Sequence, residues 1–506
     1  MSTTIDPPSA QFSSAEDTAT LEEFGYEQEL HRGIGGYAAF AAGFSFVSIL
    51  TTVFALFALG FGLGGPAFVF TWPIVFVCQF AVCLVFAELS GKFPVAGAIY
   101  QWSRRLAGET VGWFAGWFML IGYIVSVAAL AIAMQSVLPS IWSGFQIIGD
   151  DPSLTSISGA SNGILLGSVT IVACTAISSV GVALMGRITV IGVTLEIVGV
   201  FLIVGAMFVT ARRGPSAVLD TGGHGHGGGY VWAFLASMLM AAYVMYGFDS
   251  AAELSEETTN PRRTAPRAIV GALLVSGIGG GLMIIAAVMA APSLDAPEMS
   301  TQGIAWIITS QLDTWLGKAL LTIVATSIFS ATLAIQTSAS RVMFSMARDG
   351  RLPGAKVLAK VNKRTGTPLA TGVTVSVLAI AILLLNVGQA GVFTAITSVS
   401  VVIVYSAYLM VTVPALIRRL RGETLSGGPG VMSLGRWGLP VNVVAVVMGA
   451  ALMINIAWPR AEIYDPAGQG WYMQYFAVLF VGATVVVGAV CHRLIHHERE
   501  VASSTS

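Results

Sequence analysis

Long apolar runs constrain this chain more than any other feature. The hydrocarbon core of a bilayer is about 30 Å thick, so a helix that crosses it needs about 20 predominantly apolar residues. Runs of that kind follow one another along the chain, near 34–61, 66–89, 110–138, 162–185, 188–211, 229–251, 267–291, 316–340, 368–386, 391–415, 440–457 and 472–492. The sequence therefore predicts an all-α integral membrane protein with 12 transmembrane helices.

The basic residues predict which side of the membrane each loop occupies. With the N-terminus placed inside and the spans alternating, nearly all of the 25 lysines and arginines fall in inner loops. The outer loops keep only Arg212, Arg213, Lys318 and Arg460. Because cytoplasmic loops are enriched in Lys and Arg, this asymmetry predicts a multi-pass protein of the cytoplasmic (inner) membrane with both termini in the cytoplasm.

Composition excludes several classes of protein. Hydrophobic residues make up 55% of the chain and charged residues only 10%, which is too little charge to cover a soluble protein of this length. The formal net charge of -1 provides no basic field for nucleic acid. The four cysteines lie in apolar runs or at an edge of one, without metal-ligand or disulfide spacing, and are expected to be buried, inert thiols.

Two of the apolar runs contain features that weaken a helix near its middle. In the first run, Gly43 and Ser48 lie in a cluster of small and hydroxyl residues. In the sixth run, Gly247 is followed by Phe248 and Asp249. Such residues are tolerated where the segment faces protein or a water-filled cavity. The breaks lie five helices apart, which is typical of an inverted-repeat transporter with its site at the bilayer midplane. Kinks that only help packed helices fit together are the alternative.

Two loops support the repeat. Residues 92–106 and residues 297–312 are each long enough for a short amphipathic helix, and they lie on opposite sides of the membrane, as an inverted repeat requires. We therefore predict two repeats of five helices and two further helices. The predicted boundaries are a flexible cytoplasmic tail over 1–32, helices 1–5 over 33–211, helices 6–10 over 212–415, helices 11 and 12 over 416–492, and a cytoplasmic tail over 493–506.

Four ordered motifs resemble one family of transporters. GYEQELHRGIGGYAAFAAGFSFVSI (25–49) is similar to the start of helix 1 in the amino acid/choline branch of the amino acid–polyamine–organocation permeases. AELSGKFPVAGAIYQWS (87–103), YGFDSAAELSEETTNPRRTAPRAI (246–269) and SRVMFSMARDGRLP (340–353) resemble later segments of the same superfamily. The resemblance covers roughly residues 25–420 and implies the leucine-transporter-type fold, a five-plus-five inverted repeat with two C-terminal helices.

The resemblance also implies where substrate binds, between the unwound middles of helices 1 and 6. Freed backbone N–H groups there suit a carboxylate, and freed carbonyls suit an ammonium. The residues placed there are Gly43, Phe46, Val47, Ser48, Tyr246, Gly247, Phe248 and Asp249. Phe248 resembles the aromatic that covers substrate from the outside, with ordinary packing as the alternative. Gly43 and Gly247 are expected to act through the backbone, because a chain break needs freed backbone groups.

Acidic residues are the candidates for coupling and gating. Asp249 could orient the unwound segment, attract an amine or carry a coupling proton, with structural capping as the alternative. Glu253 and the two glutamates after it run toward the inner face beside the arginines of 262–267, and are interpreted as an interfacial ion-pair gate or loop anchor. Glu88 belongs to the motif that follows helix 2, interpreted as an inner loop that moves during alternating access.

Helices 5 and 8 hold two further candidates for coupling. Burial disfavours a charged carboxyl, so Glu196 in helix 5 is a candidate proton carrier, with a neutral, hydrogen-bonded structural carboxyl as the alternative. Some proton-coupled members of the superfamily carry a lysine in helix 5, and its absence here puts that coupling model in doubt. Ser327 in helix 8 could help line a sodium site, although hydroxyls bonded to their own helix are commoner.

These features favour a secondary transporter of an amino acid or related zwitterionic amine, working by alternating access as a proton-coupled symporter. An exchanger, a choline or polyamine transporter and a non-transporting nutrient sensor are alternatives. A polyamine site should present several acids, and the short tails are expected to leave no room for a signalling domain. An intramembrane enzyme is excluded, because the spans contain no HExxH, GxGD or Ser–His pair.

The expected partners are few. They are a small-molecule amino acid or amine and the lipid bilayer, with no nucleic acid. No cofactor is expected, and H+ is the predicted coupling ion, with Na+ as the alternative. His224 and His226 in a glycine-rich outer loop have no third ligand nearby, so no metal site is predicted.

Overall fold

Every regular element is a helix in the part of the chain that the computed structural model describes, which is residues 19–504 apart from 20, 155, 224–228, 313, 385–391, 429, 465–467 and 469. Ten of the described helices are long and apolar enough to cross a membrane, and two shorter apolar helices stand where the sixth and ninth spans were predicted. The predicted all-α membrane fold is confirmed. His224 and His226, where no metal site was predicted, lie outside the described residues.

The helices follow the predicted runs closely. The first half of the chain forms α2 (Gly36–Val47), α3 (Ile49–Gly64), α4 (Thr71–Lys92), α5 (Ala98–Ala107), α6 (Glu109–Ile132), α7 (Leu138–Ile141), α8 (Ile157–Val180) and α9 (Val182–Val209). The second half forms α10 (Tyr230–Val244), α11 (Ser250–Glu253), α12 (Pro261–Ala290), α13 (Pro297–Thr301), α14 (Ile304–Gln311), α15 (Thr314–Arg348), α16 (Ala355–Leu358), α17 (Leu369–Leu384) and α18 (Val392–Leu420). The last helices are α19 (Gly438–Ala457), α20 (Ala461–Tyr464), α21 (Trp471–Gln474) and α22 (Phe476–Ser504).

Local backbone chemistry sets two boundaries that apolar runs alone do not show. Gly181 has φ +146 and separates α8 from α9, so this boundary lies several residues before the one predicted at 185–188. Glycine allows this conformation because it has no Cβ. Asn260 has φ +48, and Pro261 then occupies the first turn of α12, where its missing N–H has no partner to lose.

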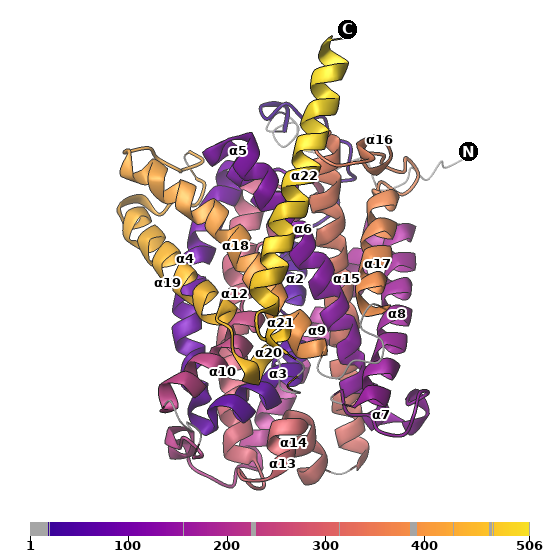
Figure 1. Ribbon diagram of the computed structural model, residues 1–506, viewed down its shortest axis with the longest axis vertical. Helices are drawn as coiled ribbons and strands as arrows, with labels where there is room; N and C mark the ends of the chain where they lie inside the picture. Colours follow the sequence, from indigo (N-terminus) through magenta and orange to yellow (C-terminus); the bar gives the residue numbers. More distant parts are fainter. Residues whose placement is uncertain are drawn as a thin grey trace, which may run out of the picture.

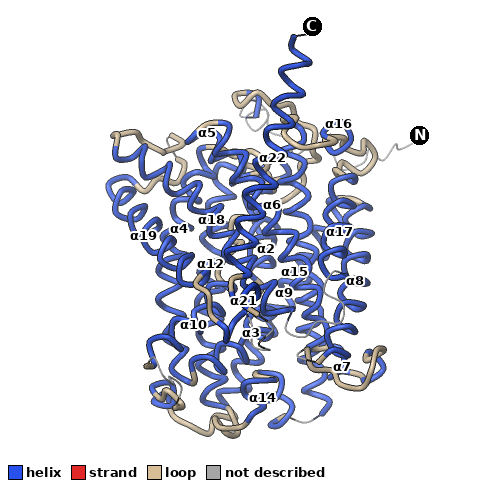
Figure 2. The backbone as a smooth tube through the Cα atoms, viewed as in Figure 1, coloured by secondary structure: helices blue, strands red, loops and turns tan. Residues whose placement is uncertain are grey.

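The interrupted helices are largely buried, whereas α19 lies along one side of the bundle and α22 crosses its front (Figures 1 and 2). Helix α2 packs against α12 and α9, and α3 packs against α10. Helix α22 crosses the front of the bundle and leaves apolar side chains such as Val486 and Val490 exposed. Because apolar surface is stable against lipid tails, these exposed faces mark the lipid-facing side of the bundle.

The two loops predicted to hold amphipathic helices do so, at opposite ends of the molecule. Helix α5 lies at the same end as α16 and the free end of α22, whereas α13 and α14 lie at the other end (Figure 1). We call the end with α5 and α16 the inner end, after the predicted orientation. This opposite placement agrees with the prediction that the loops occupy related positions of an inverted repeat.

The N-terminal segment, residues 21–34, packs on the inner end. Leu21 and Leu30 are buried, and the amides of Gly33 and Ile34 donate to the Glu257 carbonyl at 2.9 and 2.8 Å. The prediction of a flexible tail over residues 1–32 is therefore wrong for residues 21–32, which pack on the bundle. The apolar side chains of this otherwise polar segment are too few to predict that it packs on the bundle, but burying them there stabilises the contact.

Candidate functional site

The first interrupted helix breaks at Ser48, between α2 and α3. Ser48 has φ +36, a conformation that is uncommon outside glycine. Its hydroxyl donates to one oxygen of Glu196 at 3.0 Å, and the Leu50 amide donates to the same oxygen at 3.1 Å. The first amides of a helix lack partners within it, so Glu196 caps α3 and stabilises the break. These contacts correspond to the structural alternative considered for Glu196.

The second interrupted helix breaks around Gly247, between α10 and α11. Gly247 has φ +92, and a Cβ at this position would lie only 1.9 Å from Cδ1 of Phe46. The ring of Phe46 therefore lies directly on the glycine backbone, and both residues are buried. The two interrupted helices meet at this contact, as the paired breaks in the sequence predicted.

Asp249 is fully buried and is held by two tyrosines. The Tyr123 hydroxyl of α6 donates to one carboxylate oxygen at 2.9 Å, and the Tyr408 hydroxyl of α18 donates to the other. Tyr408 in turn accepts the Gly247 amide at 2.9 Å. Asp249 thus fixes the unwound segment through Tyr408 instead of bonding the backbone itself, and its buried charge is compensated by hydroxyl donors.

Aromatic rings with hydroxyl groups surround the contact between the breaks. The Phe46 ring centroid lies 5.0 Å from that of Tyr123 and 6.1 Å from that of Tyr246. The Tyr246 hydroxyl lies 2.9 Å from Ser126 Oγ and 3.3 Å from Ser400 Oγ. The region therefore offers apolar ring faces and neutral hydroxyls, whereas both oxygens of Asp249 already accept hydrogen bonds.

Two predicted site residues of α2 contribute packing instead of freed backbone groups. Gly43 is helical within α2, and a Cβ there would lie 3.3 Å from the Cβ atoms of Ala251 and Ala272. It therefore permits the close approach of α2 to α11 and α12, and the freed backbone lies at Ser48. Val47, the last residue of α2, is buried apolar core.

Phe248 belongs to a ring cluster on the inner side of the break. Its centroid lies 6.0 Å from that of Phe86 on α4 and 5.7 Å from that of Tyr408. Phe86 also packs against Trp102 of α5, at 5.3 Å. This is the ordinary packing considered as the alternative for Phe248, and the aromatic ring that covers the Gly247 backbone is Phe46.

Helix α15 contacts α2 through a pair of hydroxyls. Ser330 Oγ lies 3.1 Å from Ser45 Oγ, and both residues are buried. Ser327, the predicted sodium-site candidate, instead donates to the Ile323 carbonyl of its own helix at 3.0 Å. This is the commoner arrangement for a hydroxyl inside a helix.

The acidic segment after Asp249 forms ion pairs at the inner end, with partners other than those predicted. Arg341 Nε lies 2.6 Å from Glu257 Oε1, and Arg348 Nη2 lies 2.8 Å from Glu256 Oε1. Both arginines come from α15, and both glutamates are buried. The arginines of 262–267 lie exposed or half-buried at the start of α12, after the left-handed turn at Asn260.

The two other gating candidates lie apart from these pairs. Glu88, near the end of α4, pairs with Arg419 of α18 and accepts the Leu434 amide at 3.1 Å. It therefore anchors α4 to the segment before α19. Glu253 is fully buried, and neither of its oxygens has a hydrogen-bond partner. The structure does not place Glu253 in the predicted interfacial ion-pair gate.

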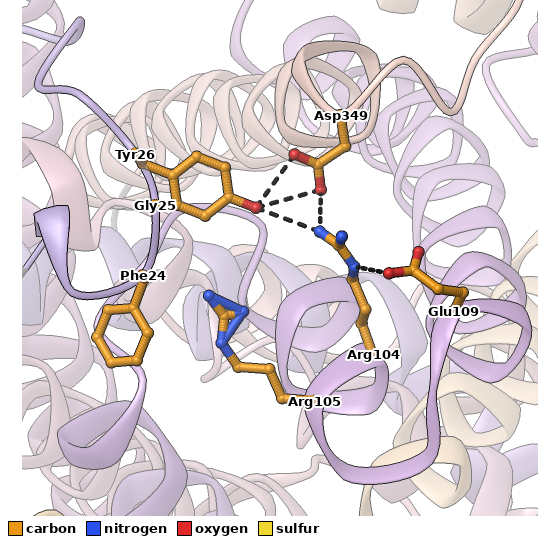
Figure 3. A pocket seen from close by; sticks show the side chains of 7 residues that line it. All are labelled: Phe24, Gly25, Tyr26, Arg104, Arg105, Glu109 and Asp349. Atoms are coloured by element: carbon orange, nitrogen blue, oxygen red, sulfur yellow. Dashed lines mark hydrogen bonds and ion pairs between the residues drawn. The ribbon is translucent and has the colours of Figure 1, made fainter. Parts of the chain in front are cut away.

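A polar cavity of about 450 Å³ lies where residues 24–26 cover the inner end (Figure 3). The Tyr26 hydroxyl lies 3.1 and 3.2 Å from the two oxygens of Asp349, and Arg104 Nη1 lies 2.6 Å from the same carboxylate. Arg104 also pairs with Glu109 at 2.7 Å. Burial raises the pKa of the Tyr26 hydroxyl, so it stays a proton donor at neutral pH. This cluster connects the N-terminal segment with α5, α6 and α15.

We expect Tyr26→Phe to loosen the N-terminal segment without unfolding the bundle. The variant loses the hydroxyl bond to Asp349, worth about 1 kcal/mol for a half-buried group, or about a fivefold change in an opening equilibrium. Amide hydrogen exchange of residues 21–34 should rise by that factor. Because the pKa of Tyr26 is raised, the wild-type contact is complete below the usual tyrosine pKa near 10 and should be unchanged between about pH 5 and 9. Unaltered exchange in the variant would contradict this role.

Several residues that organise this region could not be recognised from sequence patterns. Tyr123, Tyr408 and Ser126 stand in ordinary apolar helices, and nothing local separates them from packing residues. Their partners lie more than 100 positions away in the chain. The paired hydroxyl and carboxylate groups could be matched only once the helices were placed in space.

Known proteins resemble this chain over most of its length. The family model described as amino acid permease matches residues 34–485. A rice protein (Oryza sativa subsp. japonica) described as an amino-acid permease BAT1 homolog is 29% identical over 470 residues, which is 87% of each chain. The branched-chain amino acid permease BcaP of Lactococcus lactis subsp. cremoris is 31% identical over 310 residues, which is 59% of this chain and 64% of BcaP.

One solved structure shows the same fold at low sequence identity. The crystal structure of MhsT in complex with L-phenylalanine superposes with a TM-score of 0.56 at 13% identity, covering 82% of this chain and 98% of MhsT. This likeness concerns the fold, and it agrees with the leucine-transporter-type architecture that the resemblance of the four motifs implies.

Proposed function

The chain belongs to the amino acid permease family, and we propose that it is a secondary active transporter that moves an amino acid or related zwitterionic amine across the cytoplasmic membrane by proton-coupled symport. Members of this family are transporters and not enzymes. We propose H+ as the coupling ion, with Na+ as the alternative, and we propose that both termini face the cytoplasm, in keeping with the distribution of Lys and Arg.

The observation that carries this proposal is the meeting of two interrupted helices at Phe46 and Gly247. A broken helix frees backbone groups near the bilayer midplane, where they can replace the hydration shell of a carboxylate and an ammonium. The break at Ser48 is stabilised by Glu196, and the break at Gly247 by Tyr408. Substrate would bind between them after Phe46 moves off Gly247.

The chemistry around the breaks supports a zwitterion with an apolar side chain. Asp249 and Glu196 both accept hydrogen bonds from protein groups, so neither offers the free charge that a polyamine would require. The rings of Phe46, Tyr123 and Tyr246 provide an apolar surface. The name of BcaP adds support for branched-chain amino acids as the first substrates to test.

The inner end is closed in this conformation. Alternating access requires at least one state in which the inner end is closed. The Arg341–Glu257 and Arg348–Glu256 pairs join α15 to the segment after α11. In the proposed cycle these pairs separate, α11 tilts, and substrate leaves toward the cytoplasm. A rigid core with such a bistable inner contact is the usual structural basis for a two-state transporter.

The proposal is tested by reconstituting the purified protein in liposomes under an inward proton gradient. Labelled leucine, isoleucine, valine, phenylalanine, γ-aminobutyrate, choline and putrescine are offered in turn. Accumulation of an amino acid that a protonophore abolishes and sodium does not affect would support proton-coupled symport. Uptake that requires preloaded solute would establish an exchanger instead, and flux only of choline or putrescine would overturn the amino acid assignment. Binding without flux of any solute would favour a sensor.

A further inference from the structure

Glu253 stands out among the described carboxylates, because both of its oxygens are buried and without a hydrogen-bond partner. Its side chain is 0% exposed and lies one helical turn after Asp249. The nearest donors are the backbone amides of Gly97, Ala98 and Ile99 at the start of α5, but none forms a hydrogen bond of normal geometry. A buried carboxylate in such a position lacks the donors that normally stabilise its charge.

No cation pairs with Glu253 in the part of the chain that the structure describes. The titratable groups that face it are Asp249 on its own segment and Tyr123 on α6, whose hydroxyl already donates to Asp249. On α15, Arg341 and Arg348 are each paired with another glutamate.

The remaining elements packed around α11 offer no compensating charge either. Helix α5 carries Tyr100, Arg104 and Arg105. Tyr100 and Arg104 are bonded to Asp349, and Arg105 donates to Gln101 at 3.0 Å and lies over the Phe24 ring. The ionisable groups of α2 and α12 are Tyr37, which is 51% exposed, and the exposed or half-buried arginines of 262–267. The surroundings of Glu253 therefore supply neither a positive charge nor sufficient hydrogen bonds.

An unpaired ionised carboxylate in such a place is costly, whereas the protonated acid is neutral and needs far less stabilisation. A proton is thus the ligand that this conformation favours. We propose that Glu253 is the coupling-proton site of the transporter, protonated while the inner end is closed and deprotonated when it opens. This inference rests on the proposed function and assigns the proton to Glu253 instead of Glu196.

The position of Glu253 links protonation to the inner contacts. It lies between Asp249, beside the break, and the ion-paired glutamates Glu256 and Glu257 on one short segment. When those pairs separate, water from the cytoplasmic side would reach Glu253 before it reaches the break. The carboxylic O–H then dissociates, the proton passes to cytoplasmic water and the carboxylate is left hydrated. A proton from the outside restores the acid in the next cycle, so one proton enters per turnover.

The experiment measures substrate-driven acidification inside liposomes loaded with a pH-sensitive dye. Wild-type protein is expected to acidify the lumen when amino acid is added outside. In Glu253→Gln, which mimics the protonated acid, acidification per substrate should fall at least about tenfold, as expected when one of two coupled ligands no longer binds. Exchange of labelled for unlabelled amino acid moves no net proton and should persist. Glu253→His, which restores a titratable group, should recover part of the acidification with a different pH profile.

Two matched variants separate this site from other buried acids. Glu196→Gln and Glu256→Gln neutralise a hydrogen-bonded and an ion-paired carboxylate, and both should keep the wild-type ratio of protons to substrate even if their rates fall. Loss of that ratio in Glu196→Gln but not in Glu253→Gln would overturn the inference, as would wild-type flux without acidification.

A folding defect and a failure of the proposed function give different results. If Glu253→Gln does not fold as a monodisperse protein, infrared difference spectroscopy of the wild type provides the test. The spectrum must show a protonated carboxyl band that disappears when the inner end opens. The same band must be absent from Glu253→His. Persistence of the band in Glu253→His would overturn the assignment. Absence of any amino acid flux in the wild type would overturn the proposed function, and this inference with it. If Glu253→Gln loses both substrate affinity and exchange, Glu253 contacts the ammonium group of the substrate, and this result would overturn its role as the proton site.

Discussion

Replacing Gly247 with alanine is expected to abolish transport. The new Cβ would lie 1.9 Å from Cδ1 of Phe46, and the residue would have to keep φ +92. The backbone conformation alone costs a non-glycine residue about 1–3 kcal/mol, and the overlap adds to it. A combined cost of about 3 kcal/mol in the closed state corresponds to a loss of about 100-fold in flux. Initial uptake rates in proteoliposomes, normalised to protein, provide the measurement.

Two further variants identify the cause of this loss. Gly205→Ala is the matched control, because Gly205 lies on the exposed face of α9 with open space around its Cβ position and no positive φ. It should transport within about twofold of wild type, since alanine is the better helix former. The double variant Gly247→Ala with Phe46→Ala removes the overlap and leaves the backbone strain, so it should recover only part of the flux. Near-normal transport by Gly247→Ala would contradict the contact between the breaks.

Replacing Arg341 with methionine is expected to destabilise the closed inner end by about 3–5 kcal/mol, because it leaves the Glu257 carboxylate buried and unpaired. The two side chains are only 4% and 0% exposed, so water cannot take over the role of the guanidinium. The Glu257 carbonyl also accepts the amides of Gly33 and Ile34, which should loosen together with it. Hydrogen exchange of residues 21–34 should rise strongly and the thermal unfolding temperature should fall.

A double-mutant cycle and an exposed ion pair complete this test. Adding Glu257→Leu to Arg341→Met removes the unpaired charge and should restore most of the stability, as replacing a whole buried pair often does. Arg262→Met breaks the ion pair between Arg262 and Glu23, which joins the same N-terminal segment to α12. The side chains of Arg262 and Glu23 are 33% and 64% exposed. The substitution should change stability by less than about 1 kcal/mol. Equal effects of Arg341→Met and Arg262→Met would show that the buried pair does not hold the inner end closed.

The sequence predicted the interrupted helices but misassigned several contacts around them. Gly247 and Ser48 were placed correctly, because a glycine, hydroxyls or an acid within an apolar run are local features with a known cost in lipid. The ion pairs of Glu256 and Glu257 were predicted beside the arginines of 262–267. The structure instead pairs these glutamates with Arg348 and Arg341 on α15. Arg341 and Arg348 lie 84 and 92 positions after their glutamates, so only the packing of α15 against this segment brings them together.

The roles of the other acids also depended on distant residues. Glu196 could be read as a proton carrier or as a structural group, and the donors that distinguish these alternatives are Ser48 and Leu50, almost 150 positions away. Asp249 is satisfied by Tyr123 and Tyr408, which lie on two helices with no distinguishing pattern. Glu253 was grouped with its acidic neighbours, although neither of its oxygens forms a hydrogen bond of normal geometry.

By itself, the sequence determined the membrane spans, their breaks and the family, because these follow from the free energy of transferring each residue into lipid and from short motifs that need no partner. Tertiary structure decided which donor reaches each buried carboxylate, which ring covers Gly247 and which arginines hold the inner end closed. Hydrogen bonds and ion pairs act over about 3 Å, so they depend on how helices far apart in the chain are packed, and this packing is a property of the whole bundle.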